Sequence, residues 1–381
     1  MKSALSCLVL SLAAASAAAA ELSAIVAVEP TSKKDGMVVS RATLATSLGK
    51  AAGTTVTVVT SEDLAEVMRT TRSGGFDIFI APPQVAASAL MRGYELVGST
   101  DRAEHYVLVG RQRLGATADL KGGRLYLPQQ DSIYTYMARG MLNASGLSFK
   151  DLSAVQHERY PQAGLVAVML GQTDATVVLR SDWDEWSKAN AGAAKVLATS
   201  TSVPGGFSVV VKKDLPGDVR ARVASWFAGS AQAAGLKPVT VRAELSEYKT
   251  VAELGLFTPT MLPGAKVVTA REVAQLIARG AVMVDTRTDK EYATKHIAGA
   301  VFVPYHEKSL KDVAFDPTKD DFAGLTKLDR SKPTVFACNG AECWKSYKAS
   351  RVALAAGLKE VYWFRGGLPE WEAAGLDLAK D

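Results

Sequence analysis

Short apolar stretches alternate with amphipathic ones along most of the chain. The pattern predicts strands at residues 23–28, 55–59 and 77–81, with helices at residues 39–52 and 62–69. Strands that alternate with helices favour a mainly parallel sheet with helices on both faces. Ligands of such sheets bind at the carboxyl ends of the strands, which places Glu29, Pro30 and Pro82 to Gln84 near a cleft.

The alternation resumes after residue 118. A strand ends at residue 127, and a helix is predicted at residues 133–139. Asp131 or Ser132 is a suitable N-cap for this helix, and a helix start with hydroxyl groups is also a place where anions bind. On these residues alone, capping is the commoner role. Further elements are predicted at residues 163–170 (helix), 175–179 (strand) and 207–212 (strand).

The periodicity breaks at residues 254–264, which are rich in proline and glycine. We therefore expect a first domain at residues 21–256, a linker at 257–264 and a second domain at 265–381. The second domain begins with a helix at 269–279, where Thr269 and Glu272 have capping-box spacing. Its later elements are strands at 281–285, 301–304, 334–337 and 360–364, and a helix from Ser346 to Ala356.

The first 20 residues follow a different pattern. Lys2 precedes an apolar block, and small residues run to Ala20, as in a secretory signal peptide. Cleavage after Ala20 removes Cys7 as well. A retained membrane anchor is the alternative, but the apolar block is shorter than the roughly 20 residues that a span needs. The sequence therefore predicts export, which in a bacterium means the periplasm.

Charge and cysteine content narrow the function. The net charge of +5 is spread along the 381 residues without a dense basic run, so nucleic acid is not an expected partner. Cys338 and Cys343 lie on one loop between a predicted strand and helix. A helix N-terminus favours the thiolate, which points to sulfur chemistry at Cys338. An inert buried pair or a plain structural disulfide is the alternative on these residues alone.

Landmarks spread over residues 22–249 resemble periplasmic substrate-binding proteins of the phosphonate-binding class. They are the runs at residues 74–82, 119–122, 171–175 and 211–216, together with the polar helix start at Ser132. The resemblance implies two α/β lobes joined by crossover strands, a small-molecule ligand between them and the membrane subunits of an ABC transporter as partners. It also implies that Gln130, Ser132 and Tyr134 face an anionic group. The candidate ligand-binding residues are Pro82, Gln130, Ser132, Tyr134 and Tyr160, with Arg180 as a further candidate.

Four motifs of the second domain together resemble the rhodanese family. They are residues 284–287, 296–300, the cysteine loop and 366–371. The resemblance implies a compact α/β domain with a parallel sheet, in which Cys338 takes sulfane sulfur from a donor and passes the persulfide to an acceptor thiol. No metal or organic cofactor is implied. The candidate catalytic residues are Cys338, Cys343, Lys345 and Ser346.

Four other charged or polar residues of this domain invite a catalytic interpretation: Asp285, Arg287, Glu291 and His296. The resemblance and the physics both assign them a structural role instead. An arginine paired with a carboxylate ties the strand to the following loop, and His296 fixes a turn.

The cysteine loop departs from simple rhodaneses, where four residues separate the cysteine from an Arg-Ser pair. Here Lys345 takes the arginine position and the loop is two residues longer, so the donor need not be thiosulfate. The Cys-x-x-x-x-Cys-Trp pattern resembles rhodanese-like proteins associated with pyrroloquinoline-quinone-dependent alcohol oxidation. Cys343 is either a resolving thiol that attacks a persulfide on Cys338 or a half-cystine that stabilises the loop.

Three functions follow from these observations. The first, which we adopt as the prediction, is a solute-binding domain fused to a rhodanese-like sulfurtransferase. The second is a binding receptor whose rhodanese domain docks without catalysis. The third is a thiol-disulfide protein that uses Cys338 and Cys343 and has a periplasmic redox protein as its partner.

Overall fold

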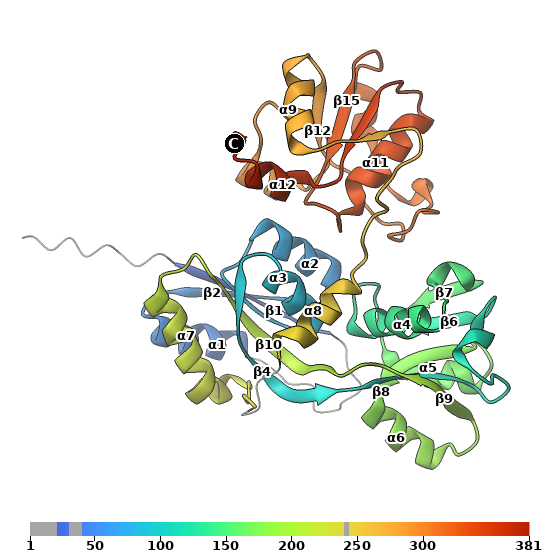
Figure 1. Cartoon of the computed structure of the whole chain (residues 1–381). Coiled ribbons are helices and arrows are strands. Elements are labelled where there is room, and N and C mark those ends of the chain that lie inside the picture. The colour runs from blue at the N-terminus through green and yellow to red at the C-terminus, as the bar shows by residue number, and fades with distance from the viewer. Residues whose placement is uncertain (1–20, 30–39, 240–243, 381) are drawn as a thin grey trace, which may run out of the picture.

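The computed structural model describes residues 21–29, 40–239 and 244–380. It shows two α/β lobes followed by a third α/β unit, which lies over α2 and α3 of the first lobe (Figure 1). The signal peptide predicted at residues 1–20 lies outside the described residues. Within the described ranges, no helix is long and apolar enough to cross a membrane.

Lobe 1 is built around a five-stranded sheet in the order β2-β1-β3-β10-β4. Helices α1, α7 and α3 pack against it, and α8 packs against α3 and β10. The elements are β1 (Leu22–Ala27), α1 (Arg41–Ala52), β2 (Val56–Ser61), α2 (Leu64–Ser73), β3 (Ile78–Ala81), α3 (Pro83–Leu90), β4 (Tyr94–Glu104), β10 (Val203–Lys212), α7 (Gly217–Gly229) and α8 (Leu245–Glu253).

Lobe 2 has a second five-stranded sheet in the order β7-β6-β8-β5-β9. Its elements are β5 (Tyr106–Arg111), β6 (Arg124–Leu127), α4 (Ile133–Ala144), β7 (Ala154–His157), α5 (Pro161–Met169), β8 (Ala175–Leu179), α6 (Arg180–Ala189) and β9 (Ala194–Thr199). The chain enters this lobe from β4 into β5 and leaves it from β9 into β10, so two crossovers join the lobes.

The expected mainly parallel sheet of the first domain is wrong in detail, because each lobe has a mixed sheet. In lobe 1, β1 pairs in parallel with β2 and β3, but β10 is antiparallel to both β3 and β4. In lobe 2, β5 is antiparallel to β8 and β9. The antiparallel pairs involve β10 in lobe 1 and β5 in lobe 2. Both strands belong to the crossovers between the lobes, so each runs in the opposite direction to the neighbouring strands of its sheet.

The C-terminal unit has a five-stranded sheet, β11-β16-β15-β12-β14, in which all the pairs are parallel, as the resemblance of its motifs implies. A small pair, β13-β17, lies apart from it. The elements are β11 (Lys266–Val267), α9 (Ala270–Ala278), β12 (Val282–Asp285), α10 (Asp289–Thr294), β13 (His296–Ile297), β14 (Val301–Phe302), β15 (Thr334–Ala337), α11 (Trp344–Ala355), β16 (Val361–Phe364), α12 (Gly367–Ala373) and β17 (Leu378–Ala379).

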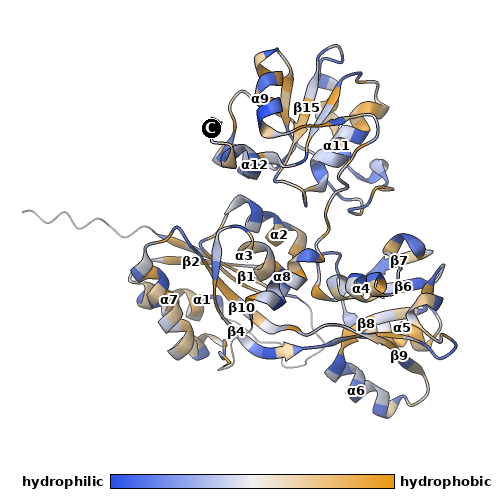
Figure 2. Cartoon of the chain, in the orientation of Figure 1, coloured by the Kyte–Doolittle hydropathy of each residue, from blue (hydrophilic) through white to orange (hydrophobic). Residues whose placement is uncertain are grey.

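Apolar side chains fill both faces of the C-terminal sheet. One cluster includes Val335 and Trp371, and the other includes Phe336 and Ala353 of α11. Successive residues of β15 therefore point to opposite faces, as the period of two in a strand requires. Figure 2 shows hydrophobic colour along strands of this unit and hydrophilic colour on several of its turns. The buried sheet provides a fixed base for the loop that follows β15.

Helix α2 brings a second face toward the C-terminal unit. Asp63 is its N-cap and accepts a hydrogen bond from the Glu66 N–H at 2.9 Å. Its apolar face, which includes Val67 and Met68, is buried in lobe 1. Arg69 and Arg72 lie three residues apart, so they share another face of the helix.

Candidate functional site between the two domains

A buried carboxylate lies between the two lobes of the first domain. Glu29 follows β1, and its Oε1 accepts a hydrogen bond from the Ile133 N–H, 3.1 Å away at the start of α4. Gln84 Nε2 donates to Glu29 Oε2 at 3.0 Å and to the Asp131 carbonyl oxygen at 3.1 Å. Burial raises the pKa of Glu29 to about 7, and these hydrogen bonds oppose the shift. The N-terminus of α4, an expected anion site, therefore already contacts a carboxylate of the protein.

The polar groups beside Glu29 are only partly hydrogen-bonded. Ser132 is the N-cap of α4, and its Oγ accepts a hydrogen bond from the Thr135 N–H at 3.2 Å. The Tyr134 hydroxyl and Gln84 Oε1 are buried and have no hydrogen-bond partner within the described part of the chain. Buried polar atoms normally have partners. These two atoms are therefore candidates for contact with a polar ligand.

The other predicted ligand-binding residues lie in different surroundings. Pro82 is the N-cap of α3 in lobe 1. Tyr160 precedes α5 and is an exposed side chain, and Arg180 begins α6 and donates to a hydroxyl of β9 at 2.9 Å. Gln130 Oε1 accepts a hydrogen bond from the Lys311 N–H at 3.3 Å. Gln130 is thus engaged by the C-terminal domain.

The cysteine loop, residues 338–343, begins at the end of the central strand of the C-terminal sheet. Cys338 directly follows β15, and Cys343 is the N-cap of α11. The helix begins at Trp344, two residues before the predicted Ser346. Gly340 has a φ of 96°, a conformation that favours glycine and allows the loop to turn. The two cysteines form a disulfide with their Cα atoms 6.1 Å apart, and they are only 2% and 3% exposed.

A buried polar network holds the start of this loop. Arg287 Nη2 donates to Asp285 Oδ2 at 2.7 Å, and Arg287 Nε lies 3.0 Å from both oxygens of that carboxylate. Arg287 Nη1 donates to Asn339 Oδ1 at 3.3 Å, and Asn339 Nδ2 donates to Glu291 Oε1 at 2.6 Å. The residue after Cys338 is thereby tied to both β12 and α10. The positive charge of Arg287 and the negative charges of Asp285 and Glu291 thus lie together beneath the cysteine loop.

Two further contacts surround the network. His296 Nδ1 lies 3.0 Å from the Tyr292 carbonyl oxygen, and the two rings stack with their centroids 3.9 Å apart. The Leu368 N–H donates to the Cys338 carbonyl oxygen at 3.0 Å. At Gly367, an added Cβ would lie 2.1 Å from that same oxygen. The glycine pair of the fourth motif thus allows the close approach of α12 to the cysteine loop.

Lys345 and Ser346 begin α11 but face different surroundings. Ser346 is buried, and its Oγ accepts a hydrogen bond from the Trp363 indole N–H at 3.1 Å. Lys345 lines a crevice together with Cys343, is 6% exposed and has no ion pair within the described ranges. Burial, and next the positive charge of Arg69, lower the pKa of Lys345 to about 8.

The loop also carries an ion pair that joins the two domains. Glu342 Oε2 lies 2.8 Å from Arg92 Nη2 and 3.6 Å from Arg72 Nη1. The side chain of Arg72 is only 3% exposed, and its Nε has no hydrogen-bond partner in the described part. Burial lowers the pKa of Arg72, and the Glu342 charge opposes this shift. The ion pair is shielded from water and is therefore screened less than an exposed one.

The segment between the domains wraps around the same loop. The Trp344 indole N–H donates to the Leu256 carbonyl oxygen at 2.8 Å. The backbone N–H and the hydroxyl of Thr258 both donate to the Ala341 carbonyl oxygen, at 2.8 and 2.7 Å. Contacts from both the interdomain segment and lobe 1 therefore converge on the residues between the two cysteines and α11.

A second bridge between the domains comes from the loop that precedes β15. Lys311 Nζ lies 2.5 Å from Asp131 Oδ2, just before α4. The same loop is held by Lys348, a fully buried residue of α11 whose Nζ donates to the Ser309 carbonyl oxygen at 3.0 Å and pairs with Glu307 at 2.7 Å. Helix α11 thus anchors both the cysteine loop and the loop that reaches lobe 2.

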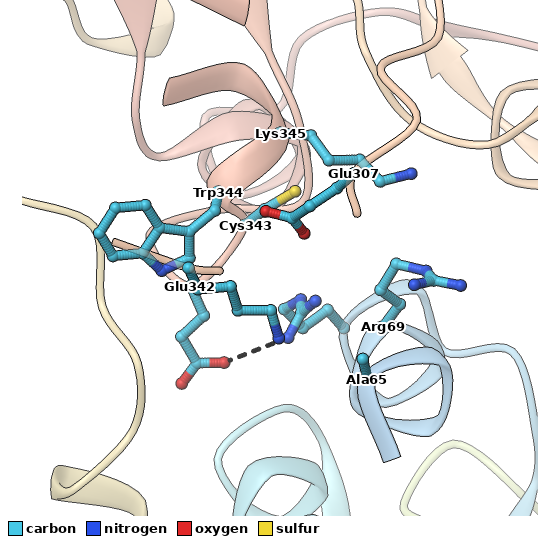
Figure 3. Close-up of a pocket in the computed structure, with 9 residues that line it drawn as sticks. Ala65, Arg69, Glu307, Glu342, Cys343, Trp344 and Lys345 are labelled. Carbon is cyan, nitrogen blue, oxygen red and sulfur yellow. Dashed lines mark ion pairs between the residues drawn. The ribbon is translucent and has the colours of Figure 1, made fainter. Parts of the chain in front are cut away.

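These contacts border a small crevice that is partly open to solvent. Figure 3 shows α2 on one side and the start of α11 on the other, with the Cys343 sulfur on the wall between them. The crevice is lined by Ala65, Arg69, Arg72, Glu307, Lys311, Glu342, Cys343, Trp344 and Lys345. Among the described residues, no cluster of His, Cys, Asp and Glu could hold a metal ion.

Four lining residues were not predicted from the sequence: Arg69, Arg72, Lys311 and Glu342. On an amphipathic helix, arginines opposite the apolar face indicate a solvated surface, and nothing in the local pattern shows that another domain covers them. One signal for Glu342 was available in the sequence, because it directly precedes Cys343. A charge beside a cysteine changes the electrostatic environment of its sulfur.

Comparison with known proteins covers both units. Residues 26–253 match the family described as ABC transporter, phosphonate, periplasmic substrate-binding protein, and residues 269–374 match the rhodanese-like domain. The HTH-type transcriptional regulator Rv0324 of Mycobacterium tuberculosis is 33% identical over 94 residues, which are 25% of this chain. The chain spans about a third of that curated relative, 35% of its length.

Two solved structures illustrate the similarity of the first unit. PhnD1 from Prochlorococcus marinus (MIT 9301), in complex with methylphosphonate, is 16% identical with a TM-score of 0.47, over 62% of this chain and 97% of that one. XAC2383 from Xanthomonas citri, bound to ATP, is 15% identical with a TM-score of 0.48, over 61% of this chain and 98% of that one. Because the first family match covers more than half of the chain, this protein belongs to the periplasmic substrate-binding proteins of phosphonate ABC transporters, and it carries a C-terminal rhodanese-like domain.

Proposed function

We propose that the C-terminal domain is a sulfurtransferase that carries sulfane sulfur as a persulfide on Cys338, fused to an exported solute-binding domain. The observation that carries this proposal is the position of Cys338 at the end of the central strand β15, one short loop before α11. The first turn of a helix has unpaired N–H groups and a positive dipole end, which stabilise a thiolate or persulfide anion. Lys345 adds a positive charge beside this loop.

The disulfide is the resting state of the proposed cycle. A dithiol reductant opens the Cys338–Cys343 bond by exchange and itself becomes a disulfide. The Cys338 thiolate then attacks the sulfane sulfur of a donor, whose S–S bond breaks and whose electron pair leaves with the remaining fragment. An acceptor thiolate attacks the outer sulfur of the persulfide, and Cys338 leaves as a thiolate again.

Cys343 provides a second outcome for the persulfide. Its thiol attacks the inner sulfur of the Cys338 persulfide, which reforms the disulfide and releases hydrosulfide. The reaction is balanced, because the sulfane sulfur leaves with the pair of electrons and the proton comes from Cys343. Removal of Cys343 is therefore expected to prolong the lifetime of the persulfide.

The first domain binds a small molecule between its lobes and presents it to the membrane subunits of an ABC transporter, in a periplasmic location that follows from its family. The unpartnered Gln84 Oε1 and Tyr134 hydroxyl provide polar contacts for this ligand. Because Glu29 already contacts the N-terminus of α4, the cleft suits a ligand without a full negative charge at that point.

A second candidate function is supported by the disulfide itself. Two cysteines on one loop that already form a disulfide are able to exchange it with a partner dithiol and transfer only electrons. In that case the C-terminal domain is a thiol-disulfide protein with a periplasmic redox protein as its partner, and no sulfur atom is transferred.

One experiment separates these two functions. The reduced full chain is incubated with a sulfane donor and its intact mass is measured, with Cys338→Ser and Cys343→Ser as variants. We expect one added sulfur atom in Cys343→Ser, a short-lived adduct with hydrosulfide release in the unmodified chain, and no adduct in Cys338→Ser. Cyanide is expected to remove the added sulfur.

The opposite result is equally clear. If the reduced chain closes rapidly to the disulfide and gains no sulfur from thiosulfate or from a larger donor, sulfur transfer is excluded and thiol-disulfide exchange remains. If the unmodified chain neither gains sulfur nor exchanges its disulfide with a dithiol, both functions are contradicted.

A further inference from the structure

We infer that the rhodanese-like domain is a clasp that holds the two lobes of the solute-binding domain closed. Reduction of the Cys338–Cys343 disulfide releases this clasp. The clasp has one anchor on each lobe, Glu342 on lobe 1 and Lys311 on lobe 2. The inference goes beyond the proposed sulfur transfer and does not depend on it, because exchange of the disulfide with a dithiol is sufficient.

The two anchors are ion pairs with little exposure to water. Glu342 Oε2 lies 2.8 Å from Arg92 Nη2, just after α3 of lobe 1. Lys311 Nζ lies 2.5 Å from Asp131 Oδ2, just before α4 of lobe 2, and these two side chains are 9% and 5% exposed. Removal of one partner of a buried pair leaves the other charge uncompensated, so each anchor is costly to break.

Helix α11 joins the two anchors within the C-terminal domain. Glu342 directly precedes Cys343, the N-cap of this helix. Lys348 of the same helix holds the loop of Lys311, because its Nζ donates to the Ser309 carbonyl oxygen at 3.0 Å. The two anchors thus belong to one packed unit and keep a fixed spacing. If the lobes move apart, this unit can follow only one of them, and one of the two ion pairs breaks.

The anchor on lobe 2 lies where the lobes contact each other. Gln84 of lobe 1 donates to the Asp131 carbonyl oxygen at 3.1 Å, while the Asp131 carboxylate pairs with Lys311. Two residues later, the Ile133 N–H donates to Glu29 of lobe 1 at 3.1 Å. Periplasmic binding proteins open and close their lobes around a ligand by hinge motion. Opening breaks these contacts between the lobes, so a clasp on Asp131 acts directly on the closed state.

The anchor on lobe 1 depends on the disulfide. Glu342 lies between the two cysteines, in the ring that their bond closes. The neighbouring Ala341 carbonyl oxygen accepts two hydrogen bonds from Thr258 of the interdomain segment. Once the bond is open, the loop gains conformational freedom, and ordering it again for docking costs free energy. Reduction is therefore expected to weaken the docking of the C-terminal domain on lobe 1.

The crevice gives a dithiol access to this bond, because Cys343 forms part of its wall (Figure 3). A thiolate of the reductant attacks the Cys343 sulfur, and Cys338 leaves as a thiolate. The second thiol of the reductant then displaces Cys343 and completes the disulfide of the reductant. Two electrons and two protons thereby pass to the cysteine pair. The redox state of the cysteines thus controls how readily the lobes open.

The test measures amide hydrogen exchange at Ile133 in the full chain by NMR. The Ile133 N–H bonds to Glu29 across the lobes, so its exchange rate follows the population of open molecules. In the oxidised chain, Lys311→Gln is expected to raise this rate roughly tenfold, the size expected for one lost charge-assisted hydrogen bond. Lys327→Gln, at an exposed lysine of the same domain, is the matched control and is expected to change the rate less than about twofold.

Two further measurements separate lobe opening from local damage. The Thr135 N–H donates to the Ser132 Oγ within lobe 2, so its exchange reports local unfolding at the start of α4. In Lys311→Gln, exchange is expected to accelerate less at Thr135 than at Ile133. Lys311→Arg keeps the positive charge facing Asp131 and is expected to restore slow exchange at Ile133.

The redox arm repeats the measurement after reduction with dithiothreitol. Reduction of the unmodified chain is expected to accelerate exchange at Ile133 by about tenfold, since the disulfide no longer constrains the docking loop. In Lys311→Gln, the same reduction is expected to add less than about threefold, because the clasp is already broken and the two changes act on one contact system.

The inference and the proposed function fail in different ways. If Lys311→Gln and Lys327→Gln have equal exchange rates at Ile133, or if Ile133 and Thr135 accelerate equally, the clasp is overturned even if Cys338 gains sulfur. If Lys311→Gln accelerates exchange but reduction does not, the control by the disulfide is overturned. If both changes act as expected while the reduced chain gains no sulfur from a sulfane donor, the clasp stands and the sulfurtransferase function fails.

Discussion

The cleft between the lobes and the crevice between the domains are opposite in charge. In the cleft, the carboxylate of Glu29 contacts the first turn of α4, and burial raises its pKa. In the crevice, Arg69 and Lys345 have no ion pair among the described residues, and burial lowers the pKa of Lys345. The first site has an excess of acceptors, and the second has an excess of positive charge.

This difference shows why the resemblance to a family does not fix the ligand of each site. The N-terminus of α4 has the geometry of an anion site, but a carboxylate of lobe 1 already takes one of its N–H groups. The surface of α2 has no such geometry, yet docking of the second domain gathers cations there. The charges left without an ion pair in each site therefore depend on the internal contacts of this chain.

The largest expected effect tests the ion pair that builds the crevice. Glu342→Gln leaves the buried charge of Arg72 without its partner, which costs about 3 kcal/mol in the docked state. Separation of the domains relieves this cost because it exposes Arg72 to water. We expect faster proteolytic cleavage in residues 255–264 and a lower melting temperature.

Glu185→Gln is the matched control for this change. Glu185 lies on α6 and is exposed, far along the chain from the crevice. If Glu342→Gln is cleaved and melts like Glu185→Gln, the ion pair does not hold the domains together and the crevice is not maintained by it.

In the cleft, the substitution Glu29→Gln is expected to stabilise the protein, and the effect is smaller than the destabilisation by Glu342→Gln. The pKa of Glu29 is raised from 4.5 to about 7, so the folded state binds more protons than the unfolded state between these values, and its stability falls as the pH rises through them. Glu29→Gln removes this cost and is expected to stabilise the protein by about 1–3 kcal/mol at pH 8.

Urea denaturation at pH 5 and pH 8 measures the effect at Glu29. The gain in Glu29→Gln is expected to shrink toward pH 5, where the carboxyl group is already protonated, and Glu185→Gln again serves as the control. A gain of equal size at both pH values would show that charge burial is not its cause.

The smallest effect is expected at an exposed pair between the lobes. Arg159 and Glu62 form an ion pair, but their side chains are 58% and 55% exposed. Water and salt screen such pairs, so Arg159→Gln is expected to change the free energy of unfolding by less than about 1 kcal/mol. A loss as large as that of Glu342→Gln would contradict the distinction between buried and exposed pairs that separates the two sites.

Much of the fold was predictable because its signals are local. The capping box at Thr269, the apolar strand before Cys338 and the glycine pair near the C-terminus each depend on neighbouring residues. The parallel sheet of the C-terminal domain was implied by the resemblance to the rhodanese family and is confirmed. The crossover strand β4, which contains polar residues at its outer end, was missed because its partner β10 is remote in sequence.

The sequence by itself determined the two classes of domain, the single loop that holds both cysteines, and the start of α4 with its Ser132 cap. Only the tertiary structure decided which charges meet. Glu29 reaches α4 because the lobes close on each other, and Arg69 and Lys345 line one crevice because two domains dock through Glu342. Local patterns fix backbone conformation over a few residues, whereas electrostatic interactions depend on distance and burial, which the folded chain alone defines.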